Sequence, residues 1–199
     1  MRRSSTQARG SDIGRSAIRA SLTDVVGLLR DPVFFASLIL VAGLLLILLF
    51  VRSGTRAETW ALIPLLVALA SIAVLDVTIR LIPDIIVLPG LAYATLLAIL
   101  LQRPALGHAL VGIAVAGTLG LLLSIVSRRG FGGGDIKLMA ALGAALGWEG
   151  ALAAFLIAHV AGALTILGLL VRRRRWPEAR FPIGAFIALS GAVMIATRG

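Results

Sequence analysis

The sequence contains no cysteine among its 199 residues, which excludes a disulfide framework, a thiol nucleophile and a cysteine metal site. Charged residues are also scarce, at 14%, whereas 59% of the residues are hydrophobic and the mean hydropathy is +1.04. Soluble domains carry about 25% charged residues. The composition therefore excludes an ordinary soluble domain and predicts an all-α, polytopic membrane helix bundle.

Several catalytic motifs are also missing. The sequence has no His-Glu-x-x-His, no Gly-x-Ser-x-Gly elbow and no phosphate-binding loop. The two histidines, His108 and His159, are interpreted as packed or hydrogen-bonded side chains. We therefore expect no metal ion and no other cofactor.

Apolar runs occupy most of the chain after its polar start. A membrane helix needs about 20 residues, and most of the runs reach that length. The run 136–147 is too short, and we expect a tilted or half-inserted helix that begins at a glycine run and breaks at 147–150. The pattern predicts six or seven membrane segments, over 33–51, 60–77, 84–102, 105–127, 136–147, 150–171 and 182–197.

Residues 1–32 are polar and rich in arginine, with a possible amphipathic surface helix over 18–29. We interpret 1–32 as a cytoplasmic extension and 33–199 as the transmembrane domain. No small-residue cleavage site follows the first apolar run, so the sequence is interpreted as that of a mature protein.

The net charge of +10 reports orientation, because the basic residues cluster between the apolar runs. We expect no nucleic-acid partner. Seven crossings with a cytoplasmic N-terminus leave only Arg52, Arg56, Arg103 and Arg198 outside. The run Arg172 to Arg175 is expected to anchor a helix end among anionic lipid headgroups. The sequence carries no signal for an oligomeric state.

Two aspartates at the edges of apolar runs are the candidate catalytic residues, since an ionisable side chain near hydrocarbon is costly. The threading places Asp76 and Asp135 on the cytoplasmic side. Each has a structural alternative: Asp76 could pair with Arg80 one helical turn on, and Asp135 could be an N-cap. Two neighbouring carboxylates can share one proton, and one can then act as a base toward water while the other acts as an acid. Peptide-bond hydrolysis is the natural reaction.

These residues resemble the motifs of the prepilin peptidases, membrane aspartyl proteases of the Gly-x-Gly-Asp type. The first motif matches Asp76, Arg80, Ile82 and Pro83, with Asp84 where asparagine is usual. The second matches Gly132, Gly134, Asp135, Lys137 and Leu138. A weaker third match is Phe181, Pro182, Ile183 and Gly184, with Ala185 where many members carry a second proline.

The resemblance implies an aspartyl endopeptidase of the bacterial inner membrane that removes the leader of type IV pilin-like precursors, after a glycine, at the cytoplasmic face. It implies Asp76 and Asp135 as the catalytic residues. Supporting or substrate-binding roles would fall to Arg80, Pro83, Asp84, Gly132, Gly133, Gly134, Lys137, Pro182 and Gly184. Asp84 could also be the partner of Asp76.

Larger members of this family carry a cysteine-rich domain between the first two membrane segments and methylate the new N-terminus. Here that connection is short, so the resemblance implies a peptidase without methyltransferase, like the Tad-type members that process Flp pilins. Two other functions stay open at the level of sequence: a proton-coupled membrane transporter component, and a non-catalytic pilus assembly subunit.

Overall fold

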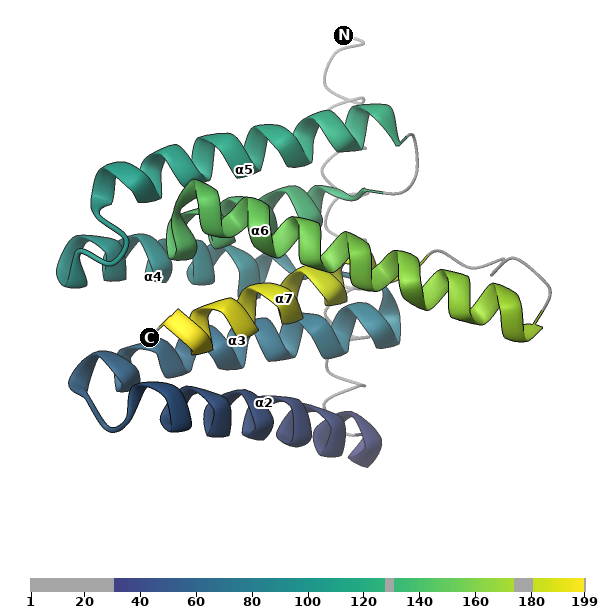
Figure 1. The fold of residues 1–199 in the computed structure, drawn as a ribbon, viewed down its shortest axis with the longest axis horizontal. Coiled ribbons are helices and arrows are strands. Elements are labelled where there is room, and N and C mark those ends of the chain that lie inside the picture. Colours follow the sequence, from purple (N-terminus) through teal and green to yellow (C-terminus); the bar gives the residue numbers. More distant parts are fainter. Residues whose placement is uncertain (1–30, 128–130, 174–180, 199) are drawn as a thin grey trace, which may run out of the picture. The chain divides into compact units, whose positions relative to one another are not determined.

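The computed structural model describes residues 31–127, 131–173 and 181–198, and these residues form helices without any strand. The all-α prediction is therefore confirmed. The predicted surface helix over 18–29 lies outside the described residues, and the division into 1–32 and 33–199 stays a prediction. In chain order, the helices are α2 (Pro32–Ser53), α3 (Ala57–Ile79), α4 (Asp84–Leu101), α5 (Leu106–Val126), α6 (Gly133–Arg173) and α7 (Ile183–Arg198) (Figure 1).

The chain divides after Ile39 into two units, so that α2 begins in the first unit and ends in the second. In the first unit, Asp31 caps the start of α2, because its Oδ1 accepts a hydrogen bond from the Val33 N–H at 2.9 Å. The second unit, from Leu40 onward, contains all the remaining helices. The description below concerns this second unit.

Helices α2 to α6 are each long and apolar enough to cross a membrane, and α7 is a shorter apolar helix. The prediction of a polytopic membrane helix bundle is confirmed. Helix α6 holds both the short run 136–147 and the following run, and Gly147 interrupts it with a φ of 72° and a ψ of 176°. Residues with a side chain rarely adopt this backbone conformation. The predicted break at 147–150 is therefore present.

The first arm of α6, residues 133–146, runs parallel to α7. Gly184, near the start of α7, faces Asp135 near the start of this arm. Further along both helices, Gly191 lies against the Leu142 side chain. Because both pairs advance in the same direction, the two segments begin at the same end of the bundle.

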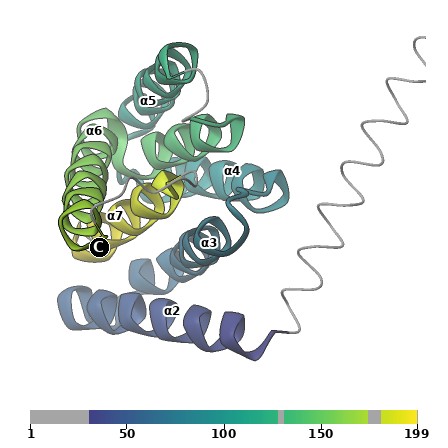
Figure 2. The ribbon, with the colours of Figure 1, turned by 90° about the vertical axis from the view of Figure 1, so that its right-hand side faces the viewer.

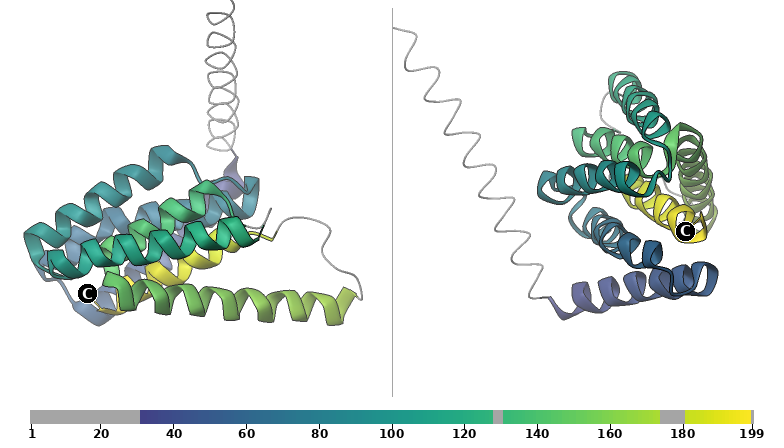
Figure 3. Two further views of the ribbon diagram at one scale, coloured as in Figure 1. Left: turned by 90° about the horizontal axis from the view of Figure 1, so that it is seen from above. Right: turned by 90° about the vertical axis from the view of Figure 1, so that its left-hand side faces the viewer.

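The second arm of α6, residues 148–173, runs antiparallel to α7. The Ser190 hydroxyl donates to the Ala154 carbonyl at 2.8 Å, whereas the earlier residue Ile183 lies near the later residue Gly162. The chain therefore reverses at Gly147, and the two arms lie on different sides of α7 (Figures 2 and 3).

Glycines allow the first arm to approach α5 at backbone distance. A Cβ at Gly112 would overlap the Gly143 carbonyl, and a Cβ at Gly120 would lie 3.1 Å from the Ile136 Cα. Gly120 precedes Val126, the last residue of α5, by about 9 Å of helix rise. The first arm therefore begins about level with Gly120, not with Val126. Asp135 thus lies deeper in the bundle than the end of α5 does.

Helix α7 contributes the buried alanine stripe Ala185, Ala188, Ala192 and Ala196, each at most 1% exposed. These small side chains recur at the spacing of one helix face and let neighbouring helices approach closely. Helix α7 packs against both α3 and α6, so it links the helix that carries Asp76 to the helix that carries Asp135.

Candidate active site

Asp76 lies in the last turn of α3 and is 7% exposed. Its Oδ2 accepts a hydrogen bond from the Ala185 N–H at 2.7 Å. Ala185 belongs to the first turn of α7, where backbone N–H groups have no partner within the helix and the helix dipole is positive. Asp76 therefore caps α7 from another helix.

The alternative interpretation of Asp76, an ion pair with Arg80, is wrong. Neither of the two ion pairs among the described residues involves Arg80, whose side chain is exposed. Arg80 instead ends α3: it adopts a left-handed conformation with a φ of 54°, and its N–H donates to the Asp76 carbonyl at 3.0 Å. The Asp76 carboxylate instead lies in the interior of the bundle.

Asp135 is 8% exposed and lies at the third position of α6. The first intrahelical bond runs from the Ile136 N–H to the Gly132 carbonyl at 3.3 Å, so Gly132 is the N-cap. The prediction that Asp135 could be the N-cap is therefore wrong. Its Oδ2 reaches back and accepts from the Gly132 N–H at 2.8 Å, as an acidic residue does in a capping box.

The remaining oxygen of Asp135, Oδ1, is buried and has no hydrogen-bond partner among the described residues. A Cβ on Gly184 would lie 2.8 Å from this Oδ1 and 2.9 Å from Asp76 Oδ2. The two carboxylates therefore face the same small space across the backbone of Gly184. An unsatisfied buried polar atom costs about 1 to 3 kcal/mol, so its retention calls for a functional explanation.

The predicted glycine run has members with different surroundings. Gly132 donates to Asp135, and a Cβ on Gly134 would lie 2.7 Å from the Ile82 Cβ, so a side chain of the α3–α4 connection occupies that face. A Cβ on Gly133 would meet no atom of the described residues within 4 Å. Gly132 and Gly133 are both exposed, and of the three glycines Gly133 is the one at which an added Cβ would make no contact with the described residues.

Asp84, the third carboxylate of the sequence motifs, pairs with Lys137: its Oδ2 lies 2.6 Å from Lys137 Nζ. The two side chains are 56% and 40% exposed, respectively. Asp84 begins α4 immediately after Pro83, a buried residue that serves as the N-cap. The structure therefore gives Asp84 a partner outside the buried carboxylate pair and ties the start of α4 to the start of α6.

Pro182 lies in the short turn that leads into α7. The Ile183 N–H donates to the Phe181 carbonyl across Pro182 at 2.9 Å, and the Phe181 ring stacks on Phe186 at a centroid distance of 5.2 Å. These contacts fix the entry to α7. They hold Gly184 in the position where its backbone borders the space that the two carboxylates face.

Sequence reasoning assigned no role to two groups that shape this site. One is the backbone N–H of Ala185, which donates to Asp76. The sequence shows only that alanine, unlike proline, has this N–H, and not what it binds. The other is the side chain of Ile82, which touches both Gly134 and Gly184. The position of Ile82 within the first motif was the feature of the sequence that could have indicated a role in the site.

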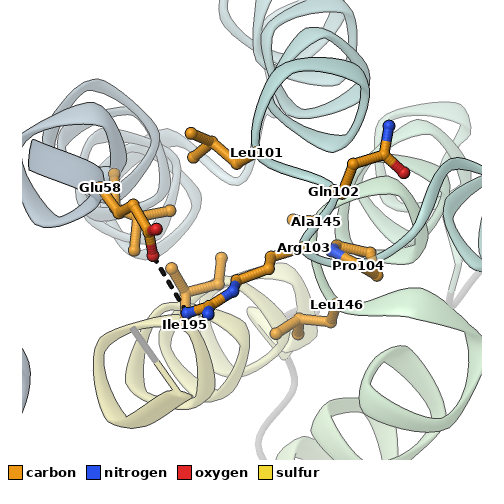
Figure 4. Close-up of a pocket in the computed structure, with 9 residues that line it drawn as sticks. Glu58, Leu101, Gln102, Arg103, Pro104, Ala145, Leu146 and Ile195 are labelled. Atoms are coloured by element: carbon orange, nitrogen blue, oxygen red, sulfur yellow. Dashed lines mark hydrogen bonds and ion pairs between the residues drawn. The ribbon is translucent and has the colours of Figure 1, made fainter.

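A cavity of about 340 Å³ lies at the opposite end of the bundle, between the start of α3 and the end of α4 (Figure 4). Its acidic residue, Glu58, is paired with Arg103 at 3.0 Å. Among the described residues that line this cavity there is no second carboxylate, so they do not supply the acid and base pair that hydrolysis needs. The buried carboxylates are therefore the better candidates for chemistry.

Comparison with known proteins places these features in context. The sequence model of the type IV leader peptidase family matches residues 63–167, which include both aspartates. The chain is 33% identical over 149 residues to a prepilin leader peptidase/N-methyltransferase of Pseudomonas putida, covering 72% of this chain and 52% of the relative. It is 38% identical over 153 residues to one of Burkholderia pseudomallei strain K96243, covering 74% and 48%, respectively.

The chain thus spans about half the length of the curated relatives that it matches. No solved structure matches it. The matched region contains α4, α5 and the first arm of α6 together with most of α3, and it stops before α7. The third side of the site, Gly184 and Ala185, therefore lies outside the family match.

Proposed function

The chain belongs to the type IV leader peptidase family, and we propose from this that it is an aspartyl endopeptidase that removes the leader of type IV pilin-like precursors. Its catalytic residues are Asp76 and Asp135. The observation that carries the proposal is the shared space between them, faced by a hydrogen-bonded oxygen of Asp76 and an unpartnered oxygen of Asp135.

The hydrogen bonds restrict where a shared proton can reside. Asp76 Oδ2 and Asp135 Oδ2 each accept from a backbone N–H, which favours the unprotonated form of both oxygens. Asp135 Oδ1 accepts from no N–H of the described residues, so this oxygen is the favoured site for the shared proton. The Asp135 carboxyl can then donate a hydrogen bond to a substrate carbonyl while the Asp76 carboxylate accepts one from water.

Hydrolysis proceeds in two steps. In the first step, the water oxygen bonds to the carbonyl carbon while Asp76 takes a proton from the water. Asp135 protonates the carbonyl oxygen in the same step. When the tetrahedral intermediate collapses, the C–N bond breaks, the leaving amine takes a proton from Asp76, and Asp135 recovers its own. The pair returns to its singly protonated state, and no cofactor takes part.

The precursor would bind at the end of the bundle where α3 ends and α6 and α7 begin. We assign this end to the cytoplasm, with the N-terminus on the same side in the inner membrane, because the positive-inside rule favours that orientation. Gly133 would lie along the substrate backbone, and Lys137 would set the local charge. The substrates would be Flp-type pilins of a Tad system.

We assign no methyltransferase activity to the chain. In the larger members of the family, the additional domain lies between the first two membrane segments. Here α2 ends at Ser53 and α3 begins at Ala57, so three residues connect them. A connection of this length has no room for a folded domain. This supports a peptidase without a methyltransferase domain between α2 and α3.

The test is co-expression with a Flp-type pilin precursor, scored by gel shift and N-terminal sequencing of the product. Asp76→Asn and Asp135→Asn should each abolish cleavage while the protein still inserts, because an amide cannot exchange the required proton. Asp84→Asn, on the exposed ion pair, is the matched carboxylate control and should still cleave.

Cleavage by well-inserted Asp76→Asn or Asp135→Asn would remove that residue from the dyad. Failure of the inserted wild type to process any pilin-like precursor would overturn the peptidase assignment. Proton flux in liposomes that disappears in Asp76→Asn would then favour the transporter alternative.

A further inference from the structure

Ile82 lies directly beside the space that the two carboxylates share. A Cβ on Gly184 would lie 2.6 Å from Ile82 Cδ1, nearer than to Asp135 Oδ1 at 2.8 Å or to Asp76 Oδ2 at 2.9 Å. One small volume is therefore bounded by two carboxylate oxygens, the backbone of Gly184 and a terminal methyl group of the α3–α4 connection.

The backbone around Ile82 is held on several sides. A Cβ on Gly134 would lie 2.7 Å from the Ile82 Cβ and 3.1 Å from its carbonyl oxygen, so this connection packs tightly on the start of α6. The connection is further fixed by the Arg80 N–H bond to the Asp76 carbonyl and by the Asp84–Lys137 ion pair. Ile82 itself is only partly buried. Its side chain is therefore a fixed wall with one accessible side.

This geometry has a consequence for any peptide that reaches the carboxylates. The carbonyl carbon under attack must approach both carboxylate oxygens, and it therefore comes close to Ile82 Cδ1, beside a volume that is too small for a further carbon atom. Non-bonded carbon atoms attract one another only at separations of about 3.5 to 4.0 Å. A glycine next to the scissile bond adds no Cβ to this volume. A larger residue would bring its Cβ toward the isoleucine methyl.

We infer that Ile82 is a specificity-determining residue, which limits the size of the substrate residue preceding the scissile bond and so selects glycine there. This inference rests on the proposed peptidase function. In this proposal, the Cδ1 methyl of Ile82 is the group that excludes a side chain on the substrate residue before the scissile bond.

The test compares precursors that carry glycine, alanine, serine or valine before the scissile bond, with rates of leader removal measured for each. Ile82→Val removes Cδ1 but keeps the Cβ and Cγ2 that pack on Gly134. It should reduce the ratio of the glycine rate to the alanine rate by about tenfold, the effect of one methylene in an apolar pocket. Ile82→Ala should reduce it further.

The matched control is Ile85→Val, which removes the same methyl from a 68% exposed residue in the first turn of α4. It should leave the ratio unchanged. An Ile82→Val enzyme that keeps the wild-type ratio would overturn the inference, as would one that inserts but cleaves no precursor. Wild type that cleaves no precursor would instead overturn the proposed function. If Ile82→Ala does not insert into the membrane, the ratio of the glycine rate to the alanine rate measured for Ile82→Val is the test of the inference.

Discussion

The Ala185 N–H donates to Asp76 Oδ2 at 2.7 Å across a separation of 109 residues. This bond joins the end of α3 to the start of α7. The bond also depends on the residue type at position 185, because a proline there would have no N–H to donate. In this chain, Asp76 therefore has a backbone partner that a proline would remove.

Ala185→Pro should destabilise the protein by about 1.5 to 3 kcal/mol, the value of a hydrogen bond to a charged group. The substitution is otherwise tolerable, since proline is accepted in the first turn of a helix. Thermal unfolding in detergent measures the effect, with Ala185→Ser, which keeps the N–H, as the control. Equal unfolding midpoints for Ala185→Pro and wild type would contradict the role of this bond.

Gly184→Ala should reduce leader cleavage by about a hundredfold, because displacing reacting groups by about 1 Å has effects of that size. The new methyl would lie within 3 Å of both facing carboxylate oxygens. The control is Gly90→Ala in α4, whose Cβ would meet nothing within 4 Å. Normal cleavage by Gly184→Ala would show that the space between the carboxylates is not where the reaction occurs.

Gly133→Ala and Gly134→Ala separate a substrate role from a packing role. Gly133→Ala meets nothing, so its unfolding free energy should stay within about 0.5 kcal/mol of wild type while cleavage slows. Gly134→Ala would press on Ile82 and should destabilise by about 1 to 3 kcal/mol. Chemical unfolding and cleavage rates are measured for both. Unchanged cleavage in Gly133→Ala would exclude its substrate contact.

A double-mutant cycle on Asp84→Asn and Lys137→Met should give a coupling energy of about 1 kcal/mol or less, because this ion pair is exposed and screened by solvent. The coupling should fall as salt concentration rises. The readout is unfolding free energy at two ionic strengths. A coupling several times larger and insensitive to salt would indicate that the pair is buried in the membrane-inserted protein.

Gly112→Ala should destabilise the bundle by about 1 to 3 kcal/mol or more, since its Cβ would overlap the Gly143 carbonyl and a backbone atom cannot rotate away. Gly107→Ala, at the start of the same helix, would meet nothing within 4 Å and serves as the control. Yield and thermal unfolding after membrane extraction compare the two. If the two variants are equally stable, α5 and the first arm of α6 do not pack this closely.

Much of the architecture follows from local sequence properties. Hydropathy alone places the helices, because a segment that crosses lipid must be apolar and must satisfy its own backbone hydrogen bonds. Gly147 marks the break in α6 for an equally local reason, the φ of 72° that other residues avoid. The order of the segments then predicts that Asp76 and Asp135 lie at the same end, and the structure places both around Gly184.

The interactions of individual side chains depended on the tertiary structure. Sequence spacing offered, as structural alternatives, Arg80 as the partner of Asp76 and an N-cap role for Asp135, whereas the structure pairs Asp76 with Ala185 and makes Gly132 the N-cap. Each of the sequence interpretations considers a single helix. The actual contacts depend on how far each helix is rotated and displaced against its neighbours.

The class of protein, the helices, the break and the two candidate carboxylates could be predicted from the sequence, because each depends on hydropathy, glycine or a short motif. Only helix packing reveals which oxygens face each other, that Asp84 binds Lys137, and that Ile82 and Gly184 bound the space between the aspartates. These relationships join residues from three or four helices. Their positions are fixed by close packing at small residues, which no property of a single segment encodes.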